Sequence, residues 1–231
     1  MSQLLNKREV RGTRSTGICL GILLAGLAGS VNAADLPPPF KDVKTGKNGV
    51  IAADQMSAAQ RAFLWKDTVQ EKGYIRVKVG RDYLGMIDAF STMPNYEPMK
   101  KMSQEAALDG LQIAGRVAEG SNRNTFIING RDGHQIAMVT VWDYKKDGAR
   151  ISRTQEFLNQ KVAAMDATLS LAVAGESGQA LWKVGAMNQE TSYEIYIREN
   201  LDRKGVPDRQ IPEVVALTEQ LLRVTRRRVG L

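Results

Sequence analysis

The fold of this chain is decided by one stretch, QEAALDGLQIAGRVAEGSNRNTFIINGRDGHQIAMVTVWD, which covers residues 104–143. At about 100° per residue, residues 104–120 place small and apolar side chains on one side and charged ones on the other, which predicts an amphipathic helix. The alanines and glycines of that side allow close approach to the layer that the helix covers. Apolar and polar residues then alternate over 125–129 and 135–143. Gly130-Arg131-Asp132-Gly133 between these two segments predicts a tight β-hairpin.

The rest of the chain adds further helices and strands. Period-two alternation predicts three more strands, at 74–80, 180–184 and 193–198. Residues 81–90 are expected to form a short strand or a turn. Helical spacing predicts three more helices, from a Ser57 cap to Glu71, from a Ser152 or Thr154 cap to 174, and over 212–227.

These elements indicate the α+β class, with an antiparallel or mixed sheet covered by amphipathic helices. We expect 74–80, 125–129 and 135–143 in the sheet, and the helices over 104–120 and 154–174 on top of it. The C-terminal helix packs on the same core or reaches a partner. The pattern leaves open whether the sheet is closed.

The N-terminus has the three-part layout of a secretory signal peptide. Basic residues from Lys7 to Arg14 precede the apolar run Ile18–Leu27, and Val31-Asn32-Ala33 supplies the small residues of a cleavage site. The run is shorter than the roughly 20 residues of a membrane span. We therefore expect a cleaved signal segment and a periplasmic protein. The alternative is an uncleaved anchor in the inner membrane.

Four segments follow from these features. Residues 1–33 are the signal peptide, and 34–54 form a linker that contains Pro and Gly. Residues 55–205 form the α+β domain, and 206–231 form a C-terminal amphipathic helix with a basic end.

Charge and residue counts exclude several kinds of site. Residues 1–33 hold four of the 32 Lys and Arg and one of the 25 Asp and Glu, so the net charge of +7 falls to +4 without them. Cys19 lies in the leader, so the exported chain has no thiol site and no disulfide. His134, the only histidine, lies at a hairpin end without the partners of a catalytic triad or a zinc site. No nucleotide or metal motif is present, so no cofactor or metal is expected.

Carboxylates offer one catalytic alternative. Asp82 and Asp88 flank residues 83–87, and Glu97 follows nearby. Two acids at a fixed separation hydrolyse glycosidic bonds, so these residues would be catalytic if the protein were a cell-wall glycan hydrolase. Sequence does not give their separation. Buried, clustered acids would favour the enzyme, and scattered exposed acids would not.

Basic and aromatic residues offer binding alternatives. Arg226, Arg227 and Arg228 would bind an anionic membrane or another polyanion, although cations also suit the last turn of a helix. Nucleic acid is not an expected partner of an exported chain. Six aromatic residues either line a binding groove or fill the core, and core packing is expected for most: Tyr74, Trp142, Tyr144, Trp182, Tyr193 and Tyr196.

The predicted helix and hairpin of residues 104–142 resemble the exported helix–hairpin modules of bacterial flagellar and outer-membrane-associated lipoproteins. This chain lacks their lipid-attachment cysteine. The resemblance covers about 40 residues and implies a non-enzymatic role in envelope assembly or surface structure. It transfers no functional residue.

The sequence therefore favours a non-catalytic exported protein that binds or assembles with other envelope proteins, either as a monomer or as a homo-oligomer. The glycan hydrolase and the module for anionic membranes or polyanions are the two alternatives.

Overall fold

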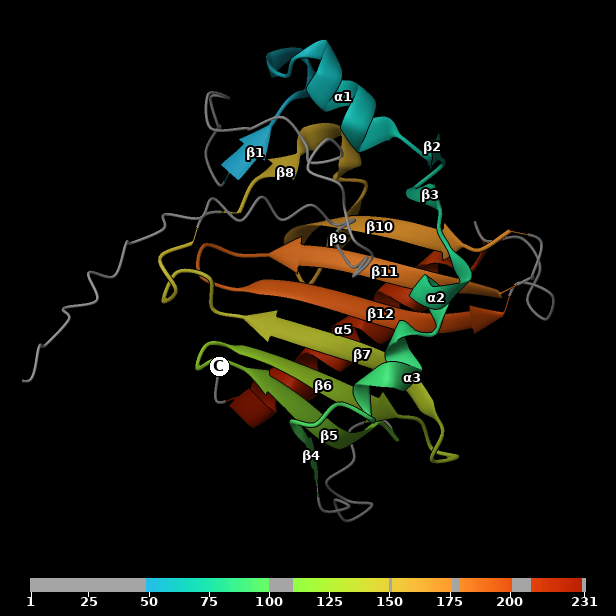
Figure 1. The fold of residues 1–231 in the computed structure, drawn as a ribbon, viewed down its shortest axis with the longest axis vertical. Coiled ribbons are helices and arrows are strands. Elements are labelled where there is room, and N and C mark those ends of the chain that lie inside the picture. Colours follow the sequence, from blue (N-terminus) through green and yellow to red (C-terminus); the bar gives the residue numbers. More distant parts are fainter. Residues whose placement is uncertain (1–48, 100–109, 150, 176–178, 201–208, 230–231) are drawn as a thin grey trace, which may run out of the picture.

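The computed structural model describes residues 49–99, 110–149, 151–175, 179–200 and 209–229. A broad twisted sheet dominates this part of the chain, with a long helix across one face and two short helices on the other (Figure 1). A small lobe lies beyond one edge of the sheet. The described part is mostly strand with a few helices, which agrees with the α+β class.

The large sheet has ten strands within the described residues, in the order β2-β3-β10-β11-β12-β7-β6-β5-β4, and β9 pairs with β10 as well. All neighbours are antiparallel except β3 and β10, which are parallel. The strands are β2 (Thr68–Glu71), β3 (Tyr74–Lys78), β4 (Tyr96–Pro98), β5 (Gln112–Glu119), β6 (Arg123–Asn129), β7 (Gln135–Trp142), β9 (Gln160–Val162), β10 (Met165–Val173), β11 (Gln179–Met187) and β12 (Ser192–Asn200).

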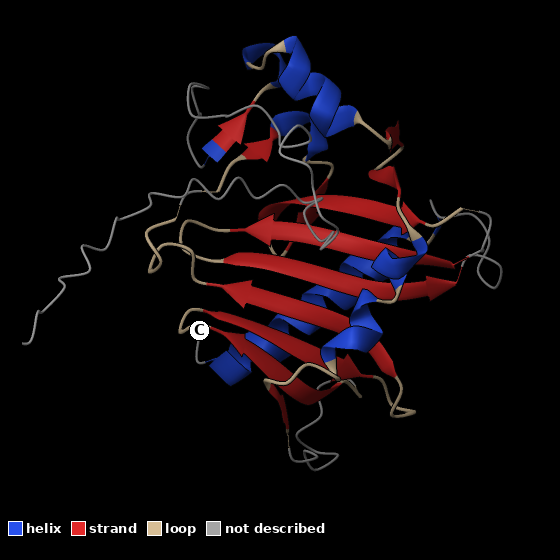
Figure 2. Cartoon of the chain, in the orientation of Figure 1, coloured by secondary structure: helices blue, strands red, loops and turns tan. Residues whose placement is uncertain are grey.

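Helix α5 (Ile211–Val229) crosses one face of this sheet diagonally (Figures 1 and 2). Its buried apolar residues Val214, Leu221 and Val224 recur at helical spacing and join the main core. Thr218 and Thr225 are also buried, and each hydroxyl donates to the carbonyl oxygen four residues earlier, so both buried hydroxyls are hydrogen-bonded.

Alternation in the strands builds the other half of this core. Inward residues of successive strands meet under α5, and the largest fully buried ones include Tyr74, Leu169, Leu171, Trp182, Tyr193 and Ile195. The ring centroids of Tyr74 and Trp182 lie 5.5 Å apart in an edge arrangement, which is a favourable aromatic contact.

The small lobe has a core of its own. Its elements are β1 (Val50–Ile51), the 3-10 helix η3 (Ala53–Gln55), α1 (Ala58–Trp65), β8 (Arg153–Thr154) and the 3-10 helix η5 (Gln155–Phe157), with β1 parallel to β8. Ile51, Met56 and Leu64 are its buried centre. The Ser57 hydroxyl accepts the Gln60 amide while the Gln60 side chain accepts the Ser57 amide, which confirms Ser57 as the cap of α1.

Two short helices, α2 (Arg81–Leu84) and α3 (Met86–Phe90), lie on the sheet face opposite α5 (Figure 2). They bring Tyr83 and Phe90 onto a second small cluster that includes Ile127, Met138 and Tyr196. The expected short strand or turn over 81–90 is therefore helical.

The helix expected over 104–120 is wrong for its described part, because residues 112–119 form β5. Residues 104–109 lie outside the described part of the chain. Ile113 and Val117 are four residues apart, which suits one face of a helix and also one face of a strand, and both are buried together with Gly115. The alanines and glycines of this segment fit the apolar side of a helix, but they also fit a strand. A glycine inside a helix costs about 1 kcal/mol relative to alanine, which counts against the helix.

The helix expected over 154–174 is also wrong. This segment forms β8, η5, β9 and β10. Residues on both faces of β10 are buried, so its apolar run lacks the clean alternation of a half-exposed strand. Ala163 and Ala164 make the β9–β10 turn with φ of 47° and 65°, a conformation that alanine composition does not signal.

Other element boundaries also differ from those expected. The helix from Ser57 ends at Trp65 instead of Glu71, because Asp67 adopts a φ of 60° and β2 follows it. Near the end of the expected linker, residues 50–51 lie in β1 and residues 53–54 lie in η3. The strands at 74–80, 125–129, 135–143, 180–184 and 193–198 and the helix over 212–227 are confirmed within a few residues.

The expected signal peptide and most of the linker lie outside the described residues. Within the described ranges, no helix is long and apolar enough to cross a membrane.

Candidate functional site

The two faces of the large sheet differ in chemistry. Toward α5, the residues of β10, β11 and β12 that join the core are apolar or aromatic. The opposite side of the sheet, which we call the polar face, carries charged and hydroxyl side chains among apolar ones. Its polar residues on the central strands include Thr125, Thr140, Thr168, Ser170, Lys183, Glu194 and Tyr196.

Strand register brings these residues together. Lys183 on β11 lies directly opposite Ser170 on one side and Tyr196 on the other. Glu194 on β12 lies opposite Thr140 and two residues before Tyr196, so it shares their face. The sequence Trp182-Lys183-Val184 explains the arrangement, because alternation sends Trp182 and Val184 into the α5 core and Lys183 to the other side.

Lys183 is the most unusual residue of the polar face, because it is a lysine that is only 5% exposed. Its Nζ lies 3.8 Å from Glu194 Oε1 and 4.9 Å from the centre of the Tyr196 ring. Burial lowers the pKa of Lys183, while the attraction of Glu194 opposes that shift and the positive charge of Arg123 adds to it.

The phenols of Tyr83 and Tyr196 close the cluster from the side of α2. Burial, together with the nearby charge of Glu194, raises the pKa of Tyr83 to about 12. Burial also raises the pKa of Tyr196. The two phenols hydrogen-bond to each other, so both stay protonated at neutral pH.

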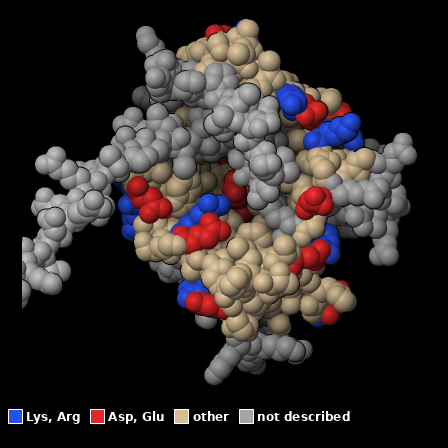
Figure 3. Space-filling view, viewed as in Figure 1, with Lys and Arg blue, Asp and Glu red and all other residues tan. Residues whose placement is uncertain are grey.

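Hydroxyl groups complete the floor of the polar face. Thr125 and Thr140 share a hydrogen bond of 2.9 Å between their hydroxyls, and Ser170 Oγ donates to the carbonyl oxygen of Lys183 at 3.3 Å. The space-filling view shows a hollow over this side of the molecule, with basic and acidic side chains inside it (Figure 3). The arrangement offers charge, hydrogen bonds and aromatic surface to a bound group.

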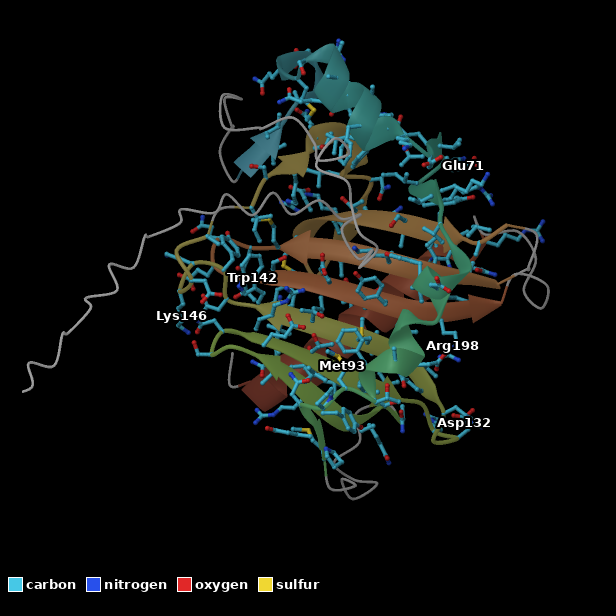
Figure 4. All side chains as sticks on the ribbon, in the orientation of Figure 1. Glu71, Met93, Asp132, Trp142, Lys146 and Arg198 are labelled. Atoms are coloured by element: carbon cyan, nitrogen blue, oxygen red, sulfur yellow. The ribbon has the colours of Figure 1, made fainter. Side chains whose placement is uncertain are left out.

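Trp142 stands at the rim of the polar face, at the end of the sheet near Lys146 (Figure 4). Its Nε1 donates to Asp147 at 2.7 Å, and the Arg123 guanidinium lies 5.9 Å from the ring centre. Hydrogen bonds from Asn122 and Trp142 lower the pKa of Asp147. These contacts fix the orientation of the Trp142 ring.

The three candidate acids lie on different elements, α2, α3 and β4, and all are exposed. Asp88 pairs with Arg198, which Figure 4 shows beside α3. Glu97 pairs with Arg116 at 2.7 Å on the neighbouring strand. Asp82 lies on α2. All three acids are thus exposed, and Asp88 and Glu97 pair with different arginines instead of with each other.

Arg226 packs against the sheet. Its Nε donates to the Tyr193 hydroxyl at 3.2 Å, its guanidinium lies 4.9 Å from the centre of the Tyr193 ring, and its other end approaches Met165. The side chains of Arg227 and Arg228 lie outside what the structure describes. At least one of the three arginines expected to bind a polyanion therefore has a structural role.

Five of the six candidate aromatic residues are buried, as expected for most of them, and Trp142 is half-buried. Tyr74, Trp182 and Tyr193 belong to the α5 core. Tyr196 lies on the polar face, and Trp142 and Tyr144 pack together near its end, with ring centroids 6.2 Å apart.

Sequence reasoning missed Lys183 and Glu194. The available signal was a charged residue inside the otherwise apolar segment 180–184. For metals, the described residues contain no group of three or more His, Cys, Asp or Glu that could hold an ion.

Comparisons of the chain with protein-family models, with curated proteins and with solved structures find no match. The case for function therefore depends on the signal-peptide pattern of the sequence and on the chemistry of the polar face.

Proposed function

We propose that this chain is a non-catalytic, exported protein of the bacterial cell envelope that binds other envelope proteins through its polar face. The observation that carries the proposal is the contrast across one sheet. One face is sealed by α5 with an apolar core, and the other is hollowed and places Lys183, Glu194 and Tyr196 together. A folded domain does not need buried charge for stability, since such pairs rarely exceed the stability of an apolar replacement.

A binding role also fits the chemistry of these groups. The two phenols of the polar face stay protonated at neutral pH, so they donate hydrogen bonds and do not act as bases. The exposed acids Asp82, Asp88 and Glu97 give no support to a hydrolase. Trp142 provides a fixed aromatic surface of the kind enriched at recognition sites.

Export is tested by cell fractionation with the intact mass of the recovered protein. The proposal predicts a periplasmic species that begins near Ala34. A full-length chain in the inner membrane would mean that Ile18–Leu27 is an anchor, and a full-length cytoplasmic chain would contradict export.

Binding is tested by chemical crosslinking in intact cells that express Glu194→Arg or Glu213→Arg. Both variants reverse one glutamate, but Glu194 lies on the polar face, whereas Glu213 is exposed in the first turn of α5. We expect Glu194→Arg to lose the crosslinked envelope species and Glu213→Arg to keep them. Equal crosslinking by both variants would contradict binding through the polar face.

Self-association is one form of the same function. Light scattering on the purified protein and on Glu194→Arg separates it from binding to other proteins. A homo-oligomer formed through the polar face dissociates in Glu194→Arg and persists in Glu213→Arg.

A further inference from the structure

We propose that the loops around Trp142, at one end of the large sheet, bind a neutral sugar ring. The inference goes beyond the proposed binding of envelope proteins, because it concerns a second class of ligand. We call this place the Trp142 site, and its other members are Asn122, Arg123 and Asp147. It lies where the β5–β6 turn, the end of β7 and the turn over 143–148 are joined by hydrogen bonds. Loops held on a rigid sheet are common places for binding sites.

A fixed aromatic ring beside polar groups is the first argument. Trp142 is half-buried, and its Nε1 donates to Asp147 Oδ2 at 2.7 Å. Asn122 Nδ2 donates to the other oxygen of the same carboxylate at 2.5 Å. The ring and its polar edge are thus oriented before a ligand arrives, which lowers the entropy cost of binding. A pyranose ring has the matching form, since its C–H face is apolar and its hydroxyls lie around the rim.

Unused hydrogen-bonding capacity is the second argument. Among the described residues, each oxygen of Asp147 accepts one hydrogen bond, and Asn122 keeps its Oδ1 and one side-chain N–H. Asp147 is exposed, so a ligand can reach these groups from solvent. The hydrogen bonds from Asn122 and Trp142 lower the pKa of Asp147, so it is an ionised acceptor at neutral pH. Two neighbouring sugar hydroxyls can therefore bond to Asp147 and Asn122 together.

The charges of the Trp142 site favour a neutral ligand. The Arg123 guanidinium lies 5.9 Å from the centre of the Trp142 ring, so a cation already occupies the place that a cationic ligand would take. The carboxylate of Asp147 repels an anionic ligand. The nearby Lys146 does not offset this charge, because it pairs with Asp143 at 2.6 Å. A charged ligand of either sign meets a like charge beside the ring, whereas a ring that bears hydroxyls meets none.

The test uses the isotope-labelled full chain and the indole N–H signals of its three tryptophans. Methyl β-D-glucopyranoside is the neutral probe, and glucosamine and glucuronate are its cationic and anionic counterparts. We expect a saturable shift of the Trp142 signal with a Kd in the millimolar range, as suits a ligand of this size. Trp65 packs on Phe157 in the small lobe and Trp182 is fully buried, so their signals should stay in place.

The probes also define the chemistry of the ligand. Glucosamine and glucuronate should each bind at least about threefold more weakly than the neutral sugar. N-acetylglucosamine is titrated in parallel to identify the natural source of the ring. Tighter binding of N-acetylglucosamine than of methyl glucopyranoside would identify the acetamido sugars of a cell-wall glycan. Equal or weaker binding would identify the hexoses of a surface polysaccharide.

Matched variants locate the site. Asp147→Asn replaces the carboxylate by an amide of the same shape and should weaken binding of the neutral sugar by about tenfold. Asp143→Asn neutralises a nearby acid that pairs with Lys146, and it should leave binding unchanged. Trp142→Ala should abolish binding, with the backbone amide of Asn122 as the reporter.

The inference is overturned if the neutral sugar leaves the Trp142 signal in place, if either charged counterpart binds as tightly, or if Asp147→Asn and Asp143→Asn bind equally well. Loss of envelope crosslinking in Trp142→Ala, in a protein that binds no sugar, would assign the ring to protein recognition instead. Sugar binding without envelope crosslinking would remove only the proposed function. Crosslinking without sugar binding would remove only this inference.

Discussion

Trp182 and Trp142 lie on opposite faces of the same sheet and illustrate how the two faces differ. Trp182 is fully buried between the sheet and α5, in contact with Tyr74. Trp142 stands at the rim of the polar face, where Asp147 fixes its N–H and Arg123 lies near its ring. Tryptophan therefore packs in the core on the α5 face and presents a fixed, partly exposed ring on the polar face.

The comparison extends to the energetics of the two faces. Burying apolar area contributes about 25 cal/mol per Å², so the α5 face supplies most of the stability. Buried charge on the polar face costs desolvation that its partners only partly return. A chain that keeps Lys183 there gives up stability at the place where we propose that it binds its partner.

Substitution of a core residue on α5 should have the largest effect. Leu221 is fully buried against the sheet, and Leu221→Ala should reduce the free energy of unfolding by about 3 kcal/mol. Thr140→Val on the polar face removes one hydroxyl partner and should cost about 1 kcal/mol. Urea unfolding followed by circular dichroism measures both. A larger loss for Thr140→Val than for Leu221→Ala would contradict the division between the faces.

Alkaline pH should weaken the polar face through Tyr83. Its pKa is raised from 10.0 to about 12, so the folded protein keeps a proton that the unfolded chain loses. The contribution is fully present below pH 10 and is lost as pH rises toward 12, at about 1.4 kcal/mol per unit. Over this range the free energy of unfolding of the wild type should fall by about 2 kcal/mol more than that of Tyr83→Phe.

Urea unfolding at pH 9.5 and pH 11.5 checks this difference, and absorbance of the phenolate gives the ionisation itself. Tyr96→Phe, which removes the phenol of a half-buried tyrosine on β4, is the control. An equal loss of stability in wild type and Tyr83→Phe would contradict a raised pKa of Tyr83 in the folded protein.

Substitution of Gly115 distinguishes a strand from a helix at this position, because the expected change in the free energy of unfolding has opposite signs in the two structures. In β5, a Cβ at this position would lie 2.3 Å from atoms of the Tyr96 ring, so Gly115→Ala must displace Tyr96 and should cost about 1 kcal/mol. In a helix the same change would stabilise by a similar amount. An increase in the free energy of unfolding would contradict the strand.

The smallest effect is expected at the surface. Asp88→Asn removes an exposed ion pair with Arg198 and should change the free energy of unfolding by no more than about 0.5 kcal/mol. Envelope crosslinking should be unchanged. A large loss of crosslinking would place the binding site at α3 instead of beside Lys183.

Sequence patterns predicted the elements in which periodicity, caps and turns agree. The 123–142 hairpin, β11, β12 and α5 fall in this group, and Ser57 caps α1 as its position before the apolar residues indicates. Gly130 and Gly133 mark the hairpin turn, where the Gly133 amide donates to the Gly130 carbonyl oxygen.

The failures have a common physical cause. In β10, residues on both faces are buried, and in β5 the buried residues Ile113 and Val117 suit either a helix or a strand, so local periodicity is ambiguous in both. The sequence missed the cluster of Lys183, Glu194 and Tyr196 for a related reason. Lys183 and Glu194 meet through the β11–β12 register, whereas the candidate acids were grouped by nearness in sequence. Only a known strand pairing would have joined Lys183 to Glu194 and Tyr196.

Photocrosslinking from single positions in living cells would decide whether recognition belongs to the polar face. One photoreactive residue replaces Ser192 on the polar face, and another replaces Ala216 on the exposed side of α5. Our account predicts discrete adducts with envelope proteins from position 192 and none from position 216. Adducts from position 216 alone would contradict it and would assign recognition to the helix.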